Sequence, residues 1–124
     1  MLKIFVTLGG LNAFLAVALG AFGAHGLKGE IPDEMLEIYQ TGVQYQMIHA
    51  IGLVIVALLS VPLGDRRWLR WSGGLMQAGI ALFSGSLYTL SLSGISAFGA
   101  VAPFGGVSFL AAWALLAAAA WKRP

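Results

Sequence analysis

Cysteine is absent from the sequence and charge is scarce. Without cysteine the chain can form no disulfide, no thiolate metal site and no cysteine nucleophile. Charged residues make up only 10% of the 124 residues, whereas soluble domains carry about 25%. So few charges cannot cover the exterior of a soluble domain, and the 59% share of hydrophobic residues indicates a protein embedded in lipid. We therefore expect membrane lipids as its surroundings.

A basic run interleaved with aromatic residues is also missing, so the sequence gives no support for binding nucleic acid. What the chain has instead is four long apolar stretches, at residues 4–26, 37–61, 69–93 and 103–121. Because about 20 such residues cross the hydrocarbon core of a bilayer, the sequence predicts an all-α, integral membrane four-helix bundle. We expect it to form one domain over residues 1–124.

The ends of these stretches carry recognisable signals. The first exceeds the roughly 7–15 apolar residues of a secretory signal, so we expect a span and not a cleaved leader. Pro32 suits the first turn of a helix, where its missing N–H costs nothing, so the second helix should begin near it. Pro62 and Gly64 should end that helix.

The positive charges predict the orientation. Six of the seven Lys and Arg residues fall on the side of the termini and the second loop, namely Lys3, Arg66, Arg67, Arg70, Lys122 and Arg123. Lys28 alone falls on the other side. Since loops rich in Lys and Arg stay in the cytoplasm, we expect both termini to be cytoplasmic and the acidic first loop to lie outside.

The second span combines an apolar character with several polar residues. Thr41, Tyr45 and His49 are spaced four residues apart, so they share one face of a helix. Gln46 adjoins this face and Gln44 is offset from it by one residue. At a rise of about 1.5 Å per residue, His49 would lie close to the middle of the bilayer.

Polar side chains in lipid need partners, and the first and third spans offer them. The candidate polar core consists of Asn12, Thr41, Gln44, Tyr45, Gln46, His49, Gln77, Ser84, Ser86 and Tyr88. Two interpretations remain open. The residues either fix the order of the helices through hydrogen bonds of about 1 kcal/mol each, or they form a ligand or permeation site.

Catalytic and cofactor sites have little support in the sequence. A proton relay through His49 would need an acidic partner in the membrane, and the deepest carboxylate, Glu37, lies at the interface. No nucleophile, acid pair or metal set accompanies it, so we expect no enzyme. His25 and His49 differ in depth by roughly 15 Å, which disfavours a haem held by both, and we expect no metal or cofactor.

Two further features concern contacts at the rim and between helices. His25, Lys28 and Glu37 could form a small polar cluster at the outer rim, or they could belong to ordinary solvated helix ends. Small residues such as Ala16 and Gly20 recur at a spacing of four in every span except the second, which favours close helix packing. One such seam could also contact a second copy or another membrane protein.

Four blocks of the sequence resemble the signature of small bacterial inner-membrane proteins of the YgdD type, a group with a short mitochondrial relative in animals. They are residues 20–27 (GAFGAHGL), 45–50 (YQMIHA), 83–88 (FSGSLY) and 103–106 (PFGG). Two positions depart from the pattern, because Ile48 stands where Tyr is common and Phe104 where Leu is common.

The resemblance implies a multi-pass protein of the bacterial inner membrane and no known activity. We therefore predict a small membrane protein with an accessory, structural or lipid-interacting role. The alternative is an oligomeric channel or transporter with a polar intramembrane site around His49.

Overall fold

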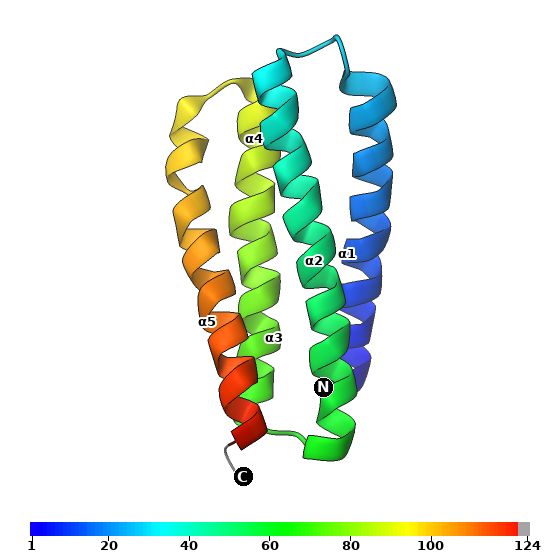
Figure 1. The fold of residues 1–124 in the computed structure, drawn as a ribbon, viewed down its shortest axis with the longest axis vertical. Helices are drawn as coiled ribbons and strands as arrows, with labels where there is room; N and C mark the ends of the chain where they lie inside the picture. The colour runs from blue at the N-terminus through cyan, green and yellow to red at the C-terminus, as the bar shows by residue number, and fades with distance from the viewer. Residues whose placement is uncertain (122–124) are drawn as a thin grey trace.

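The structure, a computed structural model, describes residues 1–121, which form four long helical rods joined by short turns (Figure 1). The first rod is α1 (Leu2–Phe22) with the π-helical turn η1 (Gly23–Leu27), and the second is α2 (Asp33–Leu63). The third rod is α3 (Arg67–Gly79), the π-helical turn η2 (Ile80–Ser84) and α4 (Gly85–Ser93). The fourth is the 3₁₀ turn η3 (Ser96–Ala100) with α5 (Ala102–Trp121). Each rod is long and apolar enough to cross a membrane. This confirms the all-α membrane bundle, and every expected span lies within one rod.

The boundaries of α2 follow from its terminal residues. Pro32 immediately precedes the helix, and Asp33 and Glu34 occupy its first turn, where the helix dipole favours negative charge. The expectation that Pro62 ends the helix was wrong, because α2 continues to Leu63. A proline in the last turn removes one hydrogen bond without breaking the helix interior. Gly64 ends the helix, since its φ of 82° is a conformation that other residues rarely adopt.

The four rods form a bundle with a central pair. α2 and the third rod contact each other along their length, whereas α1 packs mainly on α2 and α5 packs mainly on α3 and η2. α1 and α5 therefore lie on opposite sides of the central pair (Figure 1). α2 therefore has α1 and the third rod as its backbone neighbours, and α5 reaches it through side chains.

Glycines allow the two outer helices to approach closely. A Cβ atom added at Gly9 would lie 2.6 Å from Val54 Cγ2, so α1 meets α2 at this point. A Cβ atom at Gly105 would overlap the backbone of Phe83, so α5 meets η2 there. The hydrophobic effect does not draw helices together in lipid. Small residues at such crossings let the backbones approach, and the resulting van der Waals contact drives helix association.

Serine side chains add hydrogen bonds between α3 and α5. Ser72 Oγ donates to the carbonyl of Ala112 over 2.7 Å, and Ser108 Oγ donates to the carbonyl of Leu75 over the same distance. Both serines are buried. They fasten α5 to α3 without involving α2.

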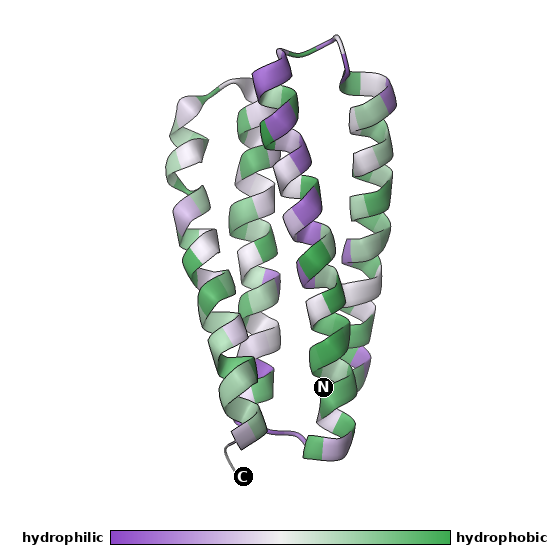
Figure 2. Cartoon of the chain, viewed as in Figure 1, coloured by the Kyte–Doolittle hydropathy of each residue, from purple (hydrophilic) through white to green (hydrophobic). Residues whose placement is uncertain are grey.

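The ends of the bundle differ in polarity. α1 begins, α5 ends and α2 connects to α3 at one end, the lower end in Figure 1, which we call the termini end. The basic residues described at this end are Lys3, Arg66, Arg67 and Arg70; Lys122 and Arg123 lie outside the described residues. At the opposite end, polar residues occupy the first half of α2, whereas its second half is apolar (Figure 2). The cytoplasmic location of the termini stays a prediction.

Candidate functional site

Four polar side chains, one each from α1, α2, α3 and α4, form a continuous chain of hydrogen bonds that we call the amide network. The Tyr88 hydroxyl donates to Gln46 Oε1 over 2.7 Å. Gln46 Nε2 donates to Asn12 Oδ1 over 3.1 Å. Asn12 Nδ2 in turn donates to Gln77 Oε1 over 2.8 Å. The network therefore links the first rod to both central rods.

The buried groups of the amide network are satisfied within the protein, whereas Gln77 Nε2, on a half-buried side chain, makes no hydrogen bond with a described residue. Gln46 and Asn12 are buried, and Asn12 Nδ2 also donates to the carbonyl of Leu8. Among the described residues no buried side-chain nitrogen or oxygen lacks a hydrogen-bond partner. Buried polar groups satisfied in this way stabilise a fold, so the network explains the polar residues on this side of α2 as structural.

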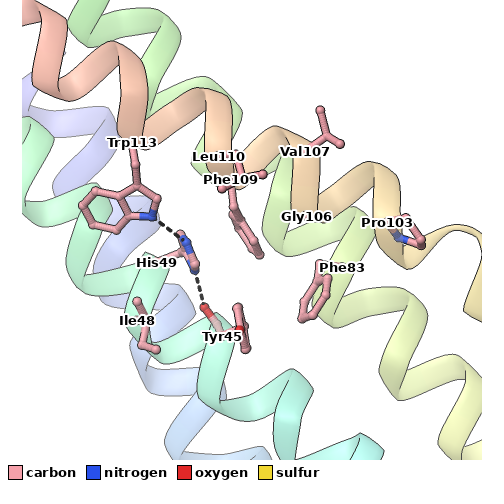
Figure 3. A pocket seen from close by; sticks show the side chains of 10 residues that line it. All are labelled: Tyr45, Ile48, His49, Phe83, Pro103, Gly106, Val107, Phe109, Leu110 and Trp113. Carbon is pink, nitrogen blue, oxygen red and sulfur yellow. Dashed lines mark hydrogen bonds between the residues drawn. The ribbon is translucent and has the colours of Figure 1, made fainter.

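His49 is held from two sides, as Figure 3 shows. Its Nδ1 lies 2.7 Å from the carbonyl oxygen of Tyr45. Because a carbonyl can only accept, Nδ1 carries the proton and Nε2 is the acceptor. Trp113 donates its indole N–H to Nε2 over 2.9 Å. The imidazole also stacks on Phe109, with ring centroids 3.5 Å apart.

This geometry limits the chemistry of His49. Both ring nitrogens are engaged, so a metal ion or a relayed proton would have to displace a hydrogen bond. Within residues 1–121 no three His, Asp or Glu side chains gather closely enough to hold a metal ion. His49 therefore acts in this structure as a link between α2 and α5.

A groove of about 580 Å³ lies beside His49, between α2 and α5 (Figure 3). We call it the aromatic groove, and it is lined by Tyr45, Ile48, His49, Phe83, Pro103, Gly106, Val107, Phe109, Leu110 and Trp113. Ile48, Val107 and Leu110 are exposed apolar side chains. The groove therefore opens on the apolar side of the bundle.

The position of the groove along the helices places it within the membrane. α2 has 31 residues and is about 46 Å long, whereas the hydrocarbon core measures about 30 Å. His49 lies near the midpoint of α2, and Trp113 lies near the midpoint of α5. The inner end of the groove therefore faces lipid, while Pro103, the second residue of α5, places its other end close to the membrane surface.

Two positions in the groove bear on what it can hold. Tyr45 is 38% exposed, and its hydroxyl makes no hydrogen bond with any described residue. Gly106 lies in the groove wall, and a Cβ atom added there would meet no atom within 4 Å. The groove thus has one free polar group and spare volume on α5.

The remaining residues of the expected polar core have separate roles. Ser84 is buried and donates to the carbonyl of Gly42 over 2.7 Å, which links η2 to α2. Thr41 donates to the carbonyl of Glu37, and Ser86 donates to carbonyls one turn earlier in its own rod. The hydroxyls of Thr41 and Ser86 therefore bind carbonyls of their own rods, and these residues join neither the network nor the groove.

The placement of Gln44 in the polar core was wrong. Its side chain is exposed and makes no hydrogen bond with the described residues. The reason is geometric, since two residues turn a helix by about 200° and thus place Gln44 almost opposite Gln46. The ten residues of the expected polar core divide into the amide network, the groove and four separate residues, Thr41, Gln44, Ser84 and Ser86.

Of the two alternatives for the outer rim, the structure agrees with ordinary solvated helix ends and not with a polar cluster. His25, Lys28 and Glu37 are all exposed, and no ion pair or hydrogen bond joins them. They lie on η1, on the loop after it and on α2, respectively. Their polar ends can be solvated separately, so burial does not force them together.

The termini end carries two well-defined arginine contacts. Arg66 donates to the carbonyls of Leu63 and Ala119 over 2.8 and 2.9 Å, and so caps the ends of α2 and α5. Arg70 Nε donates to Asp65 Oδ1 over 2.7 Å. This hydrogen bond lowers the pKa of the Asp65 carboxyl below its usual range.

Sequence reasoning missed the residues that α5 and η2 contribute, above all Trp113, Phe109 and Phe83. Trp113 carried a usable signal. The other tryptophans lie near helix ends, whereas Trp113 lies in mid-span, where its indole N–H needs an acceptor. His49 is at a similar depth and provides one.

Comparison with known proteins identifies the family. Residues 19–106 match a family model described as "Protein of unknown function (DUF423)". The UPF0382 membrane protein YwdK of Bacillus subtilis is 54% identical, and the UPF0382 membrane proteins SERP0230 of Staphylococcus epidermidis and SAB0533 of Staphylococcus aureus are 43% and 44% identical. Each alignment covers 98% of both chains.

No solved structure matches the chain significantly. The bacterial relatives are named membrane proteins, and the structure has four helices able to span a bilayer, which agrees with a multi-pass protein of the bacterial cell membrane. The chain therefore belongs to the DUF423 family, a family of membrane proteins of unknown function.

Proposed function

We propose that the protein is a non-enzymatic membrane factor that holds an apolar molecule of the bilayer in the aromatic groove. The observation that carries this proposal is the groove itself, about 580 Å³ in volume, apolar, and open at membrane depth. Ligand pockets in proteins measure about 300–1,000 Å³. A cavity of this size facing lipid is filled by lipid-soluble molecules, so we take these as the partners of the protein.

The absence of catalytic groups from the groove supports a binding role. Its lining contains no Asp, Glu, Lys, Arg or Ser side chain. His49, the one lining residue capable of acid–base chemistry near neutral pH, has both nitrogens engaged. A reaction site needs a nucleophile, a base or an electrophile in reach of the substrate, and the only such group that the lining offers in free form is the Tyr45 hydroxyl.

The alternative of an oligomeric channel or transporter has weaker support. A permeation path needs polar groups that can exchange partners with water or ions. The hydrogen bonds of the amide network join protein side chains to one another, and the rim of the groove consists of apolar side chains. We therefore favour a lipid-interacting role over transport.

We also propose that the chain belongs with the wider YgdD-type group, which has a mitochondrial relative in animals, and that this group shares the groove except at Ile48, where Tyr is common. The supporting observation is the position of the resembling blocks. Residues 45–50 supply Tyr45 and His49 to the groove, residues 83–88 supply Phe83, and residues 103–106 supply Pro103 and Gly106.

Native mass spectrometry of the protein released from lipid nanodiscs tests the proposed function. The key variant is Gly106→Leu, whose side chain would fill the groove, and Gly10→Leu is its matched control. Both positions have open space around an added Cβ atom, but only Gly106 lines the groove. We expect the parent and Gly10→Leu to retain a bound apolar molecule and Gly106→Leu to lose it.

Two results would contradict the proposal. The parent could carry no bound molecule under conditions that preserve its fold, or Gly106→Leu could retain as much as Gly10→Leu. The same spectra count subunits in multiples of 13.0 kDa, so they also report any homo-oligomer.

A further inference from the structure

We propose, building on the function above, that the aromatic groove binds the ring of a lipophilic quinone, with the Tyr45 hydroxyl donating a hydrogen bond to one of its carbonyl oxygens. The proposal concerns binding alone. It follows from the walls of the groove, from its one free polar group and from its lack of charge.

The walls favour a flat aromatic-like ring over a saturated chain. Tyr45 and Phe83 lie with ring centroids 4.7 Å apart and inclined by 46°, and Phe83 and Phe109 lie 5.7 Å apart at 61°. Trp113 adds an indole on α5 (Figure 3). These rings pack on one another, and the parts of them that line the groove are aromatic surface, which planar π systems contact favourably. A saturated acyl chain would gain contact area without this geometric preference.

The polar groups specify a ligand that accepts a hydrogen bond. Both nitrogens of His49 and the indole N–H of Trp113 already bind each other or the backbone. The Tyr45 hydroxyl is the one side-chain polar group of the groove without a partner among residues 1–121. A hydroxyl at membrane depth gains from an acceptor, because lipid tails provide none.

The charge of the lining selects among membrane-soluble molecules. No charged side chain lines the groove, so a fatty acid carboxylate or a phospholipid headgroup would lose its hydration without compensation. A quinone ring is neutral and planar, it carries two carbonyl oxygens, and it dissolves in the bilayer. It is thus the ligand class that matches the shape, the donor and the neutrality of the groove.

Quenching of Trp113 fluorescence by decylubiquinone in nanodiscs tests this inference. Replacing Trp68, Trp71 and Trp121 with Phe would leave Trp113 as the reporter in the groove wall. Decylbenzene, which has a ring and the same tail but no carbonyl, is the matched ligand control. We expect decylubiquinone to quench saturably and decylbenzene to compete weakly.

Two variants separate the parts of the proposal. Tyr45→Phe keeps the ring and removes the hydroxyl, so we expect the apparent dissociation constant for decylubiquinone to rise about fivefold, the effect of one neutral hydrogen bond. Gly106→Leu should abolish saturable quenching, and Gly10→Leu should preserve it. If the tryptophan replacements prevent folding, the mass gain of the natural sequence on decylubiquinone in native mass spectrometry replaces the fluorescence readout.

The inference is overturned if quenching stays linear in decylubiquinone concentration, or if it is equal in the parent and in Gly106→Leu, because both results indicate random collision in the bilayer. Equal affinities of the parent and Tyr45→Phe would remove the proposed hydrogen bond. A bound lipid that is lost in Gly106→Leu, together with no saturable quenching, would overturn the quinone inference and leave the proposed function standing. Failure of both tests would reject both.

Discussion

The two sides of α2 accommodate polar side chains within the bundle in different ways. Towards α1, the helices approach closely at Gly9, and the polar side chains there bind one another in the amide network. Towards α5, the aromatic side chains of Trp113 and Phe109 span the space to His49. The first side pairs its buried polar groups with one another, and the second leaves a groove with one free hydroxyl, that of Tyr45.

This difference shows how residues adjacent in sequence acquire distinct roles. Tyr45 and Gln46 are neighbours in the chain, yet Gln46 is buried in the network and Tyr45 lines the groove. The spacing of the neighbouring helix decides the outcome. A close neighbour converts a polar side chain into a structural contact, whereas a distant one leaves room for a ligand.

Substitutions at two consecutive glycines of α5 should give the largest difference in unfolding free energy. Gly105→Ala should lower the free energy of unfolding by about 1–3 kcal/mol, because the added methyl group overlaps the backbone of Phe83. Gly106→Ala should change it by less than about 1 kcal/mol, since the new methyl group enters the groove. Equilibrium unfolding of the purified protein in mixed micelles measures both. Equal losses for the two variants would refute the described packing of α5.

The amide network gives the next largest effect. Gln46→Leu removes the donor to Asn12 and the acceptor for Tyr88, so we expect a loss of about 1–2 kcal/mol in unfolding free energy. Gln44→Leu is the matched control, because Gln44 is exposed and makes no hydrogen bond with the described residues. The same unfolding assay should show no loss for the control. If Gln44→Leu lost more unfolding free energy than Gln46→Leu, the assignment of the amide network to the Gln46 face of α2 would be wrong.

A smaller effect is expected where α2 and α5 are bridged. His49→Phe keeps a ring beside Phe109 but removes the acceptor of the Trp113 indole N–H. We expect a loss of about 0.5–1 kcal/mol in unfolding free energy and an upfield shift of the Trp113 indole proton in NMR spectra of ¹⁵N-tryptophan-labelled protein. The Trp68 signal serves as the internal control and should not move. An unchanged Trp113 signal would show that the bridge does not form.

The smallest effect lies outside both regions, in the ion pair at the termini end. Arg70 lowers the pKa of Asp65 in the folded protein, so this pair contributes stability above the ordinary carboxyl pKa of about 3.9. That contribution is lost as the pH falls through the lowered pKa. Comparing the melting temperatures of the parent and Asp65→Asn from pH 6 downwards should show a slight advantage of the parent that decreases below about pH 3.9. An advantage that grows towards low pH would contradict the assigned sign.

The fold could be predicted from the sequence because it depends on properties of single segments. Hydropathy and length define the four spans, and Pro32 signals the start of α2. The polar face of α2 was also visible, since helical spacing alone places Tyr45 and His49 together. Each of these inferences needs no knowledge of which helix lies next to which.

The division of the polar residues between the amide network and the groove could not be predicted, because it depends on which helices are neighbours. Gln77 and Tyr88 join the network because the third rod lies beside α2, and Trp113 reaches His49 because α5 lies on the other side. Hydropathy does not encode helix order around a bundle. The groove depends in addition on Gly106, whose significance is a missing side chain at a position that only the structure identifies.

Native mass spectrometry and unfolding of Gly106→Leu and Gln46→Leu, on the same preparations, test most directly where the ligand binds. We expect Gly106→Leu to lose the bound apolar molecule and keep its stability, whereas Gln46→Leu should lose stability and still bind the molecule while folded. The opposite pattern, with binding lost in Gln46→Leu and retained in Gly106→Leu, would contradict the assignment of the ligand site to the aromatic groove.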